Sequence, residues 1–122
     1  MTAKRVEDGP GKLVFACSGA ADVGQLSDLA ARRLARTGVG RMYCLAGIGG
    51  GVPAIIETTR AAGRILAIDG CPQDCARKSL EKAGFSDFLH LQLADLGLSK
   101  GQSSVNPERV DFVVQKATDL LK

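Results

Sequence analysis

Short apolar runs alternate along this chain with segments in which apolar residues recur every three or four positions. The runs are LVFAC at 13–17, RMYCLAG at 41–47, RILAID at 64–69 and FLHLQLADL at 88–96. Continuous apolar runs of this length are typical of strands that are covered on both faces. We therefore predict four strands, one in each run.

The segments between and after these runs have the apolar spacing of amphipathic helices. We predict a first helix from about Asp22 and a last helix from Pro107. Two further helices are predicted to begin at Pro53 and Pro72, because proline is favoured at the first helical position. The strands and helices therefore alternate.

This alternation predicts βαβ units and a parallel sheet with right-handed crossovers. We expect an α/β protein with a three-layer, Rossmann- or flavodoxin-like fold: a four-stranded parallel sheet in the order 2-1-3-4, with helices on both faces. Residues 12–122 are predicted to form this single domain. Residues 1–11 contain charges, Gly and Pro without periodicity and are predicted to be a flexible tail.

Charge and aromatic content argue against a nucleic-acid partner. Sixteen basic residues stand against thirteen acidic ones, giving a net charge of +3, and the two signs are interspersed. Four Phe, one Tyr and no Trp offer few platforms on which bases could stack. We expect no nucleic-acid partner.

No apolar segment approaches the roughly 20 residues that a membrane span needs, and no signal-peptide pattern is present. We therefore expect a soluble, cytoplasmic protein with no membrane partner. Thiols stay reduced in the cytoplasm, so the four cysteines indicate a metal site or catalysis rather than disulfides.

The cysteines follow the strand pattern. Cys17, Cys44 and Cys71 are 27 residues apart in each case, and each stands at the carboxyl end of a predicted strand. These ends share one edge of a parallel sheet, and neighbouring strands are only ~4.8 Å apart. Cys75 follows Cys71 by about one helical turn. We therefore expect all four thiols to converge on the edge where open α/β sheets bind ligands.

Four converging thiols suit a metal ion. Zn²⁺ takes four thiolates in a tetrahedron, and an Fe–S cluster, which we favour less, uses the same ligands. The alternative is that each cysteine is simply a small buried apolar residue. That alternative is weaker for four cysteines in register than for any one of them.

These residues resemble the DGC-domain family, named for a central Asp-Gly-Cys tripeptide. Asp69, Gly70 and Cys71 supply the tripeptide, and Cys17, Cys44 and Cys75 fall where the family pattern has cysteines. The similarity extends from about Leu13 into the final helix. It implies an α/β domain that binds zinc through Cys17, Cys44, Cys71 and Cys75, and it implies no particular reaction.

Other polar residues are candidates for supporting roles. Asp22, Asp69 and Asp95 lie at or near the same edge and could orient a ligand, although for Asp69 and Asp95 we favour the capping of backbone N–H groups. His90 is predicted to lie in mid-strand with a structural role. Cys71, as the N-cap before Pro72, is predicted to be the most reactive thiol. The loop 97–106 should emerge on the cysteine edge and could cover the site.

Two functional hypotheses follow from the sequence. The first is a zinc-binding protein with a role in metal homeostasis or regulation. The second is a thiol-based enzyme, or a protein that handles sulfur or metal, using the same cysteines for redox or transfer chemistry. The sequence assigns no catalytic residue.

Overall fold

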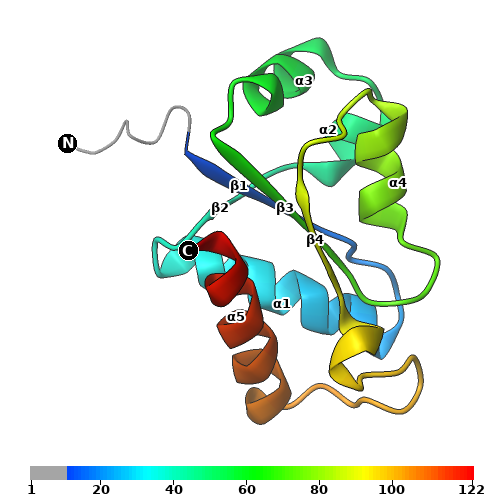
Figure 1. Ribbon diagram of the computed structural model, residues 1–122. Coiled ribbons are helices and arrows are strands. Elements are labelled where there is room, and N and C mark those ends of the chain that lie inside the picture. Colours follow the sequence, from blue (N-terminus) through cyan, green and yellow to red (C-terminus); the bar gives the residue numbers. More distant parts are fainter. Residues whose placement is uncertain (1–10) are drawn as a thin grey trace.

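The computed structural model describes residues 11–122. Its sheet contains β1 (Lys12–Ala16), β2 (Arg41–Met42), β3 (Arg64–Asp69) and β4 (Leu89–Gln92). All neighbouring strands are parallel, and their order is β2-β1-β3-β4 (Figure 1). The predicted α/β class and the strand order 2-1-3-4 are confirmed. Apart from Gly11, the predicted tail lies outside the described residues.

Helices cover both faces of the sheet (Figure 1). On one face, α1 (Asp22–Arg36) packs beside α5 (Pro107–Leu121). The other face carries α2 (Leu45–Gly49), α3 (Pro53–Arg60) and α4 (Cys75–Lys82), and a 3₁₀ turn, η1 (Leu93–Leu96), follows β4. None of the helices described between residues 11 and 122 is both long and apolar enough to cross a membrane.

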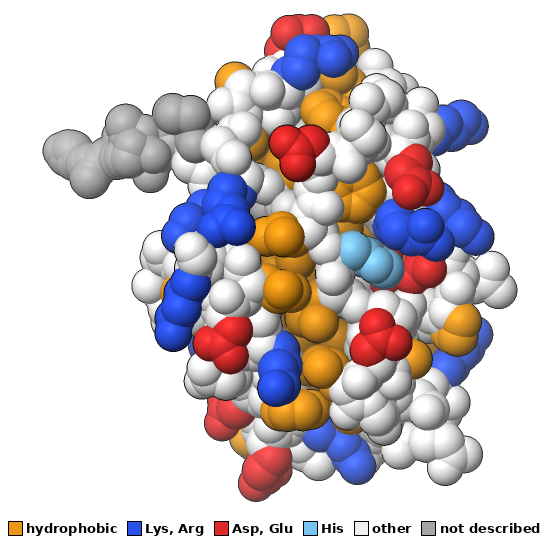
Figure 2. Space-filling model, in the orientation of Figure 1, with side chains coloured by type: hydrophobic (Ala, Val, Ile, Leu, Met, Phe, Trp, Pro, Cys, Tyr) orange, Lys and Arg blue, Asp and Glu red, His pale blue; other side chains and the backbone are white. Residues whose placement is uncertain are grey.

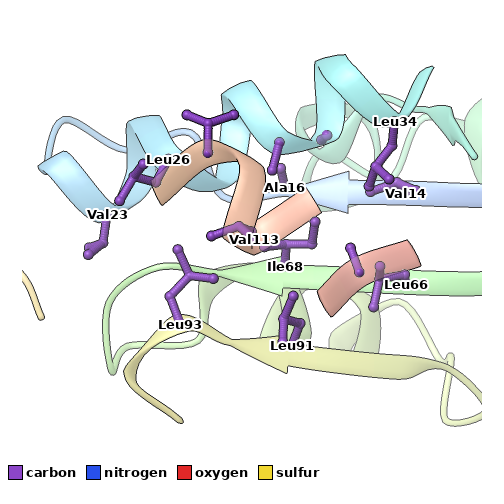
Figure 3. Packing of buried hydrophobic residues seen from close by; sticks show 14 of the residues in the cluster. Val14, Ala16, Val23, Leu26, Leu34, Leu66, Ile68, Leu91, Leu93 and Val113 are labelled. Atoms are coloured by element: carbon purple, nitrogen blue, oxygen red, sulfur yellow. The ribbon is translucent and has the colours of Figure 1, made fainter. Parts of the chain in front are cut away.

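Successive strand residues point to opposite faces, so the sheet builds two apolar cores. The larger core lies under α1 and α5 (Figure 3), and its strand residues are Val14, Ala16, Leu66, Ile68 and Leu91. The smaller core lies under α2 and α4, and its strand residues are Leu13, Phe15, Ile65 and Ala67. Burial on both faces explains why these strands are continuous apolar runs.

The helix signals at both ends of the domain were predicted correctly. The first helix begins at Asp22 and carries basic residues in its last turn, which complement the helix dipole. The last helix begins at Pro107, and the side chain of Asn106 caps it by accepting the N–H of Arg109 at 2.8 Å. Pro53 opens α3 as predicted.

Three element boundaries differ from the sequence predictions. The predicted strand 41–47 ends at Met42, because the chain turns into the short helix α2 at Leu45. The predicted strand 88–96 continues only to Gln92 before η1. Pro72 does not open a helix, since α4 begins at Cys75. An apolar run fits a buried helical turn as well as a strand, and proline fits a turn as well as the start of a helix. In these three places the packing of the domain selects the conformation that the sequence did not predict.

Candidate functional site

Three of the four cysteines line one cavity at the carboxyl edge of the sheet. The cavity has a volume of about 430 Å³, and Cys17, Cys71 and Cys75 contribute to its wall. The loop between β1 and α1, the first turn of α1 and the loop after η1 complete the lining through Gly19, Ala20, Ala21, Gly24 and Lys100. Three of the four thiols that the sequence predicts to converge therefore line one cavity, and the loop 97–106 reaches the cavity through Lys100.

Cys17 is held in place by its backbone. Its N–H donates to the carbonyl of Ile68 at 3.0 Å, which extends the pairing of β1 with β3 by one residue. Its carbonyl accepts the hydroxyl of Ser27, a fully buried residue of α1. Burial raises the pKa of the Cys17 thiol, and the neighbouring thiol of Cys75 raises it further. Cys17 is therefore a half-buried, mainly protonated thiol with Cys75 beside it.

Cys71 and Cys75 flank a short connection between β3 and α4. Cys71 is half-buried, whereas Cys75, the first residue of α4, is exposed. The prediction that Cys71 caps this helix is wrong: Asp74 holds the N-cap position in a left-handed conformation, with φ +56°. Cys75 is therefore the cysteine that lies in the first turn of this helix.

Cys44 lies apart from this cavity. It is exposed, and it caps α2, because its Sγ accepts the N–H of Gly47 at 3.3 Å. Among the described residues, no three cysteine sulfurs lie within 4.8 Å of one another. The structure therefore gathers three cysteines around a cavity and leaves the fourth at the end of the neighbouring strand.

Asp69 fixes the start of α4 from the end of β3. Its side chain is only 1% exposed, and it accepts the N–H of Ala76 at 2.7 Å and that of Arg77 at 3.0 Å. Two amides at the first turn of a helix are thereby satisfied by a carboxylate, which is favourable for the helix dipole. The role that we favoured for this residue, acceptance of backbone N–H groups, is confirmed.

A polar network connects β4 to the segment that carries Cys71 and Cys75. The Nε2 atom of His90 lies 2.9 Å from Oδ2 of Asp69 and 3.5 Å from Oδ1 of Asp74. The side-chain amide of Gln92 donates to the carbonyl of Cys71 at 3.0 Å and to Oδ1 of Asp74 at 2.6 Å. The single histidine is partly exposed at the surface, pale blue in Figure 2.

Sequence reasoning missed this network. Asp69, Asp74 and His90 have ligand atoms within 4.8 Å of one another. Their proximity depends on the pairing of Ala67 with His90 and of Asp69 with Gln92 across two parallel strands. Aligning the carboxyl ends of the third and fourth predicted strands would have placed His90 and Gln92 on the same face as Asp69.

Asp22 and Asp95, the other two aspartates that the sequence analysis named as candidates, have different positions in the structure. Asp22 accepts the N–H of Gly101 at 2.9 Å and that of Ser103 at 3.0 Å, so it fastens the loop 97–106 to the start of α1. These amides, with Gly101 the larger contributor, hold the pKa of the Asp22 carboxyl below its usual range. Asp95 is exposed on η1 and does not line the cavity.

Each residue of the tripeptide Asp69-Gly70-Cys71 has a different structural role. Asp69 caps α4, and Cys71 lines the cavity. At Gly70, a Cβ atom would lie 2.4 Å from the carbonyl oxygen of Val23, so only glycine allows β3 to meet the first turn of α1 this closely.

A model of the DGC domain matches residues 13–117, nearly all of the described chain. The chain belongs to the DGC domain family.

One relative of this chain is named "Anaerobic and virulence modulator AnvM", from Pseudomonas aeruginosa. It is 42% identical over 100 residues, which cover 82% of this chain and 76% of the relative. No solved structure matches the chain.

Proposed function

We propose that this DGC-domain protein binds zinc through Cys17, Cys71 and Cys75, with Cys44 as the fourth ligand, and acts as a metal-dependent regulatory protein. The observation that carries the proposal is the convergence of three thiols on one cavity at the carboxyl edge of the sheet. Open α/β sheets bind their ligands at this edge.

The donor set fits zinc. Thiolates are the ligands of structural zinc sites, and three of the four cysteines line one cavity. Sulfurs bound to one zinc ion at ~2.3 Å lie within about 4 Å of one another, so these thiols must draw inward on binding. Zinc would supply a cross-link between the loops that follow β1, β2 and β3.

Cys44 can join the site from the adjacent strand. It follows β2, which pairs directly with β1 through Leu13–Arg41 and Val14–Met42. Its sulfur accepts the N–H of Gly47 and lies outside the wall of the cavity, so it must move toward the other three thiols to bind the same ion. We therefore expect Cys44 to be the last ligand to engage.

A regulatory role is supported better than catalysis. The residues that line the cavity include no carboxylate or imidazole, the usual groups for proton transfer. Asp69 and His90 are nearby but are engaged with each other, and Asp69 also holds α4. The name of AnvM describes a modulator, which favours a regulatory function for this chain also.

The test is metal analysis of the full chain purified without chelator. We expect about one zinc per chain by elemental mass spectrometry, as for a single thiolate site. Separate Cys→Ser changes at 17, 44, 71 and 75 should each lower the zinc content, whereas Asp95→Asn, at an exposed aspartate on η1, should retain it. A wild-type protein without bound zinc, and unable to take it up when supplied, would disprove the proposal.

Two further outcomes refine the ligand set. If Cys44→Ser alone retains full zinc occupancy, Cys44 is not a ligand and the site has three thiolates. Chelation should leave the far-UV circular dichroism signal in place, because the apolar cores on both faces of the sheet do not depend on metal. A loss of that signal would show that the metal is required for folding.

A further inference from the structure

The thiols of Cys17 and Cys75 are neighbours, although 57 residues separate them in the chain. They line the same cavity, and the Cys75 thiol, after burial, is among the groups that raise the pKa of Cys17. Their positions follow from the sheet, because Cys17 comes directly after the pair Ala16–Ile68, one step beyond the end of β1. Asp69, the next residue of β3, holds the first turn of α4, where Cys75 lies.

We propose that Cys17 and Cys75 form a reversible disulfide when the metal-free protein meets a hydroperoxide. The disulfide would remove two ligands of the zinc site, so the inference gives a redox control of the proposed function. The pairing itself rests only on the arrangement of the two cysteines.

The exposure of the two residues sets the order of events. Both residues line the cavity, but Cys75 is exposed, so an oxidant reaches it first, whereas Cys17 is half-buried. The Cys75 sulfur attacks the terminal peroxide oxygen and the O–O bond breaks. The departing hydroxide or alkoxide takes up the thiol proton and leaves as water or an alcohol. This step leaves a sulfenic acid on Cys75.

The second step closes the disulfide. The Cys17 sulfur attacks the Cys75 sulfur, the S–O bond breaks, and the hydroxyl group leaves as water with the proton of Cys17. In total, two thiols and one hydroperoxide give one disulfide, one water and one water or alcohol. The peroxide is reduced by two electrons and the cysteine pair is oxidised by two.

The other pairings are less favourable. Cys71 is separated from Cys75 by a turn in which its carbonyl is held by Gln92 at 3.0 Å and by the N–H of Asp74 at 3.3 Å. Moving the Cys71 backbone toward Cys75 would disturb these hydrogen bonds. Cys44 lies outside the cavity wall and uses its sulfur as a helix cap. Disulfides need Cα atoms about 4.4–6.8 Å apart, so a pairing that displaces the backbone is disfavoured.

The experiment uses the full chain, stripped of metal by a chelator and treated with equimolar hydrogen peroxide. We expect two of the four thiols to disappear and to return with dithiothreitol. Peptide mass mapping without reduction should then find residues 17 and 75 linked. A dominant link between 71 and 75, or between 17 and 71, would overturn the inference, as would oxidation of Cys75 while the thiol of Cys17 stays free.

Variants separate the roles of the two thiols. Cys71→Ser and Cys44→Ser should still form the linked peptide, which makes them matched controls for the change of thiol to hydroxyl. In Cys17→Ser, the sulfenic acid on Cys75 should persist and react with dimedone at that position. Because Cys17 is half-buried, circular dichroism must first show that this variant folds; if it does not, Cys75→Ser, at an exposed position, must abolish the link.

The outcomes distinguish this inference from the proposed function. A disulfide between 17 and 75 in a protein that never binds zinc supports the redox pair and disproves the metal site. Zinc binding in a protein that forms no such disulfide supports the metal site and disproves the redox pair. If both hold, zinc should protect the two thiols, and oxidation should release the metal.

Discussion

His90 on β4 lies 2.9 Å, through its Nε2 atom, from the Oδ2 atom of Asp69, the same carboxylate that caps α4. One buried side chain therefore connects the edge strand to the helix that carries Cys75. Buried polar groups of this kind are costly unless each is satisfied, and the partners of Asp69 satisfy it. The geometry of the thiol cavity consequently depends on residues outside its wall.

Replacing Asp69 by Asn should destabilise the domain. The amide offers one acceptor oxygen where the carboxylate has two, so its NH₂ group would face the N–H of Ala76 in one orientation, and the N–H of Arg77 together with His90 in the other. An unsatisfied buried donor costs about 1–3 kcal/mol, and we expect a loss of stability of that size in urea unfolding. Asp87→Asn, at an exposed position, is the control. Equal stability of the two variants would show that Asp69 does not hold α4.

The sequence predicted the sheet better than the loops at its edge. β3 was predicted to the residue, since six consecutive residues between Gly63 and Gly70 form an apolar run that ends in Asp. The start of α4 could not be predicted, because its cap comes from Asp69 across a turn in which Asp74 has a positive φ. Such a cap depends on tertiary geometry, whereas Pro72 gave only a local signal.

For the candidate site as well, the sequence predicted the positions of residues at strand ends better than the conformation of the loops that follow. The common position of Cys17, Cys44 and Cys71 at strand ends is a property of βαβ spacing, and it correctly placed them at one edge. The direction of each side chain depends on the loop that follows. Cys44 enters a short helix that its own sulfur caps, and an apolar run of seven residues cannot distinguish this turn from a longer strand.

Gly70→Ala should be strongly unfavourable for packing. The added Cβ would lie 2.4 Å from the Val23 carbonyl oxygen and 2.9 Å from the Gly24 nitrogen, both of which are backbone atoms. Either β3 or the first turn of α1 must shift, at a cost of about 1–3 kcal/mol. Gly49→Ala is the matched control, because its Cβ would meet no heavy atom within 4 Å. Thermal unfolding of both variants measures the difference in Tm. A Gly70→Ala protein with the Tm of the wild type would contradict the close packing at this position.

Acid should release the loop 97–106 from α1. Because the pKa of Asp22 is lowered in the folded protein, its contribution is complete above the unfolded value of about 3.9 and is lost as pH falls through the lower folded value. Between these values, we expect the amide resonances of Gly101 and Ser103 to shift together in NMR spectra.

Asp22→Ala should produce the released state at neutral pH. Hydrogen exchange of the Gly101 and Ser103 amides should become faster, since both lose their acceptor. Asp28→Ala is the control, because the hydrogen bonds described for Asp28 go to Ser18 and Arg32 and none goes to this loop. Unchanged exchange at both amides in Asp22→Ala would show that other contacts, such as the buried Leu98 and Ser103, hold the loop.

The order of thiol alkylation tests the exposure of the cysteines directly. Cys75, the first residue of α4, has an exposed side chain that a reagent can reach. Burial raises the pKa of Cys17 above the ordinary value of about 8.5, so little of it is ionised at neutral pH. In the metal-free protein at pH 7, sub-stoichiometric iodoacetamide should therefore modify Cys75 ahead of Cys17 and of half-buried Cys71, as read by peptide mass mapping. Raising the pH to 9 should accelerate the modification of Cys17, because more of its thiol is then ionised. If Cys71 reacts first instead, exposure does not set the order of reaction.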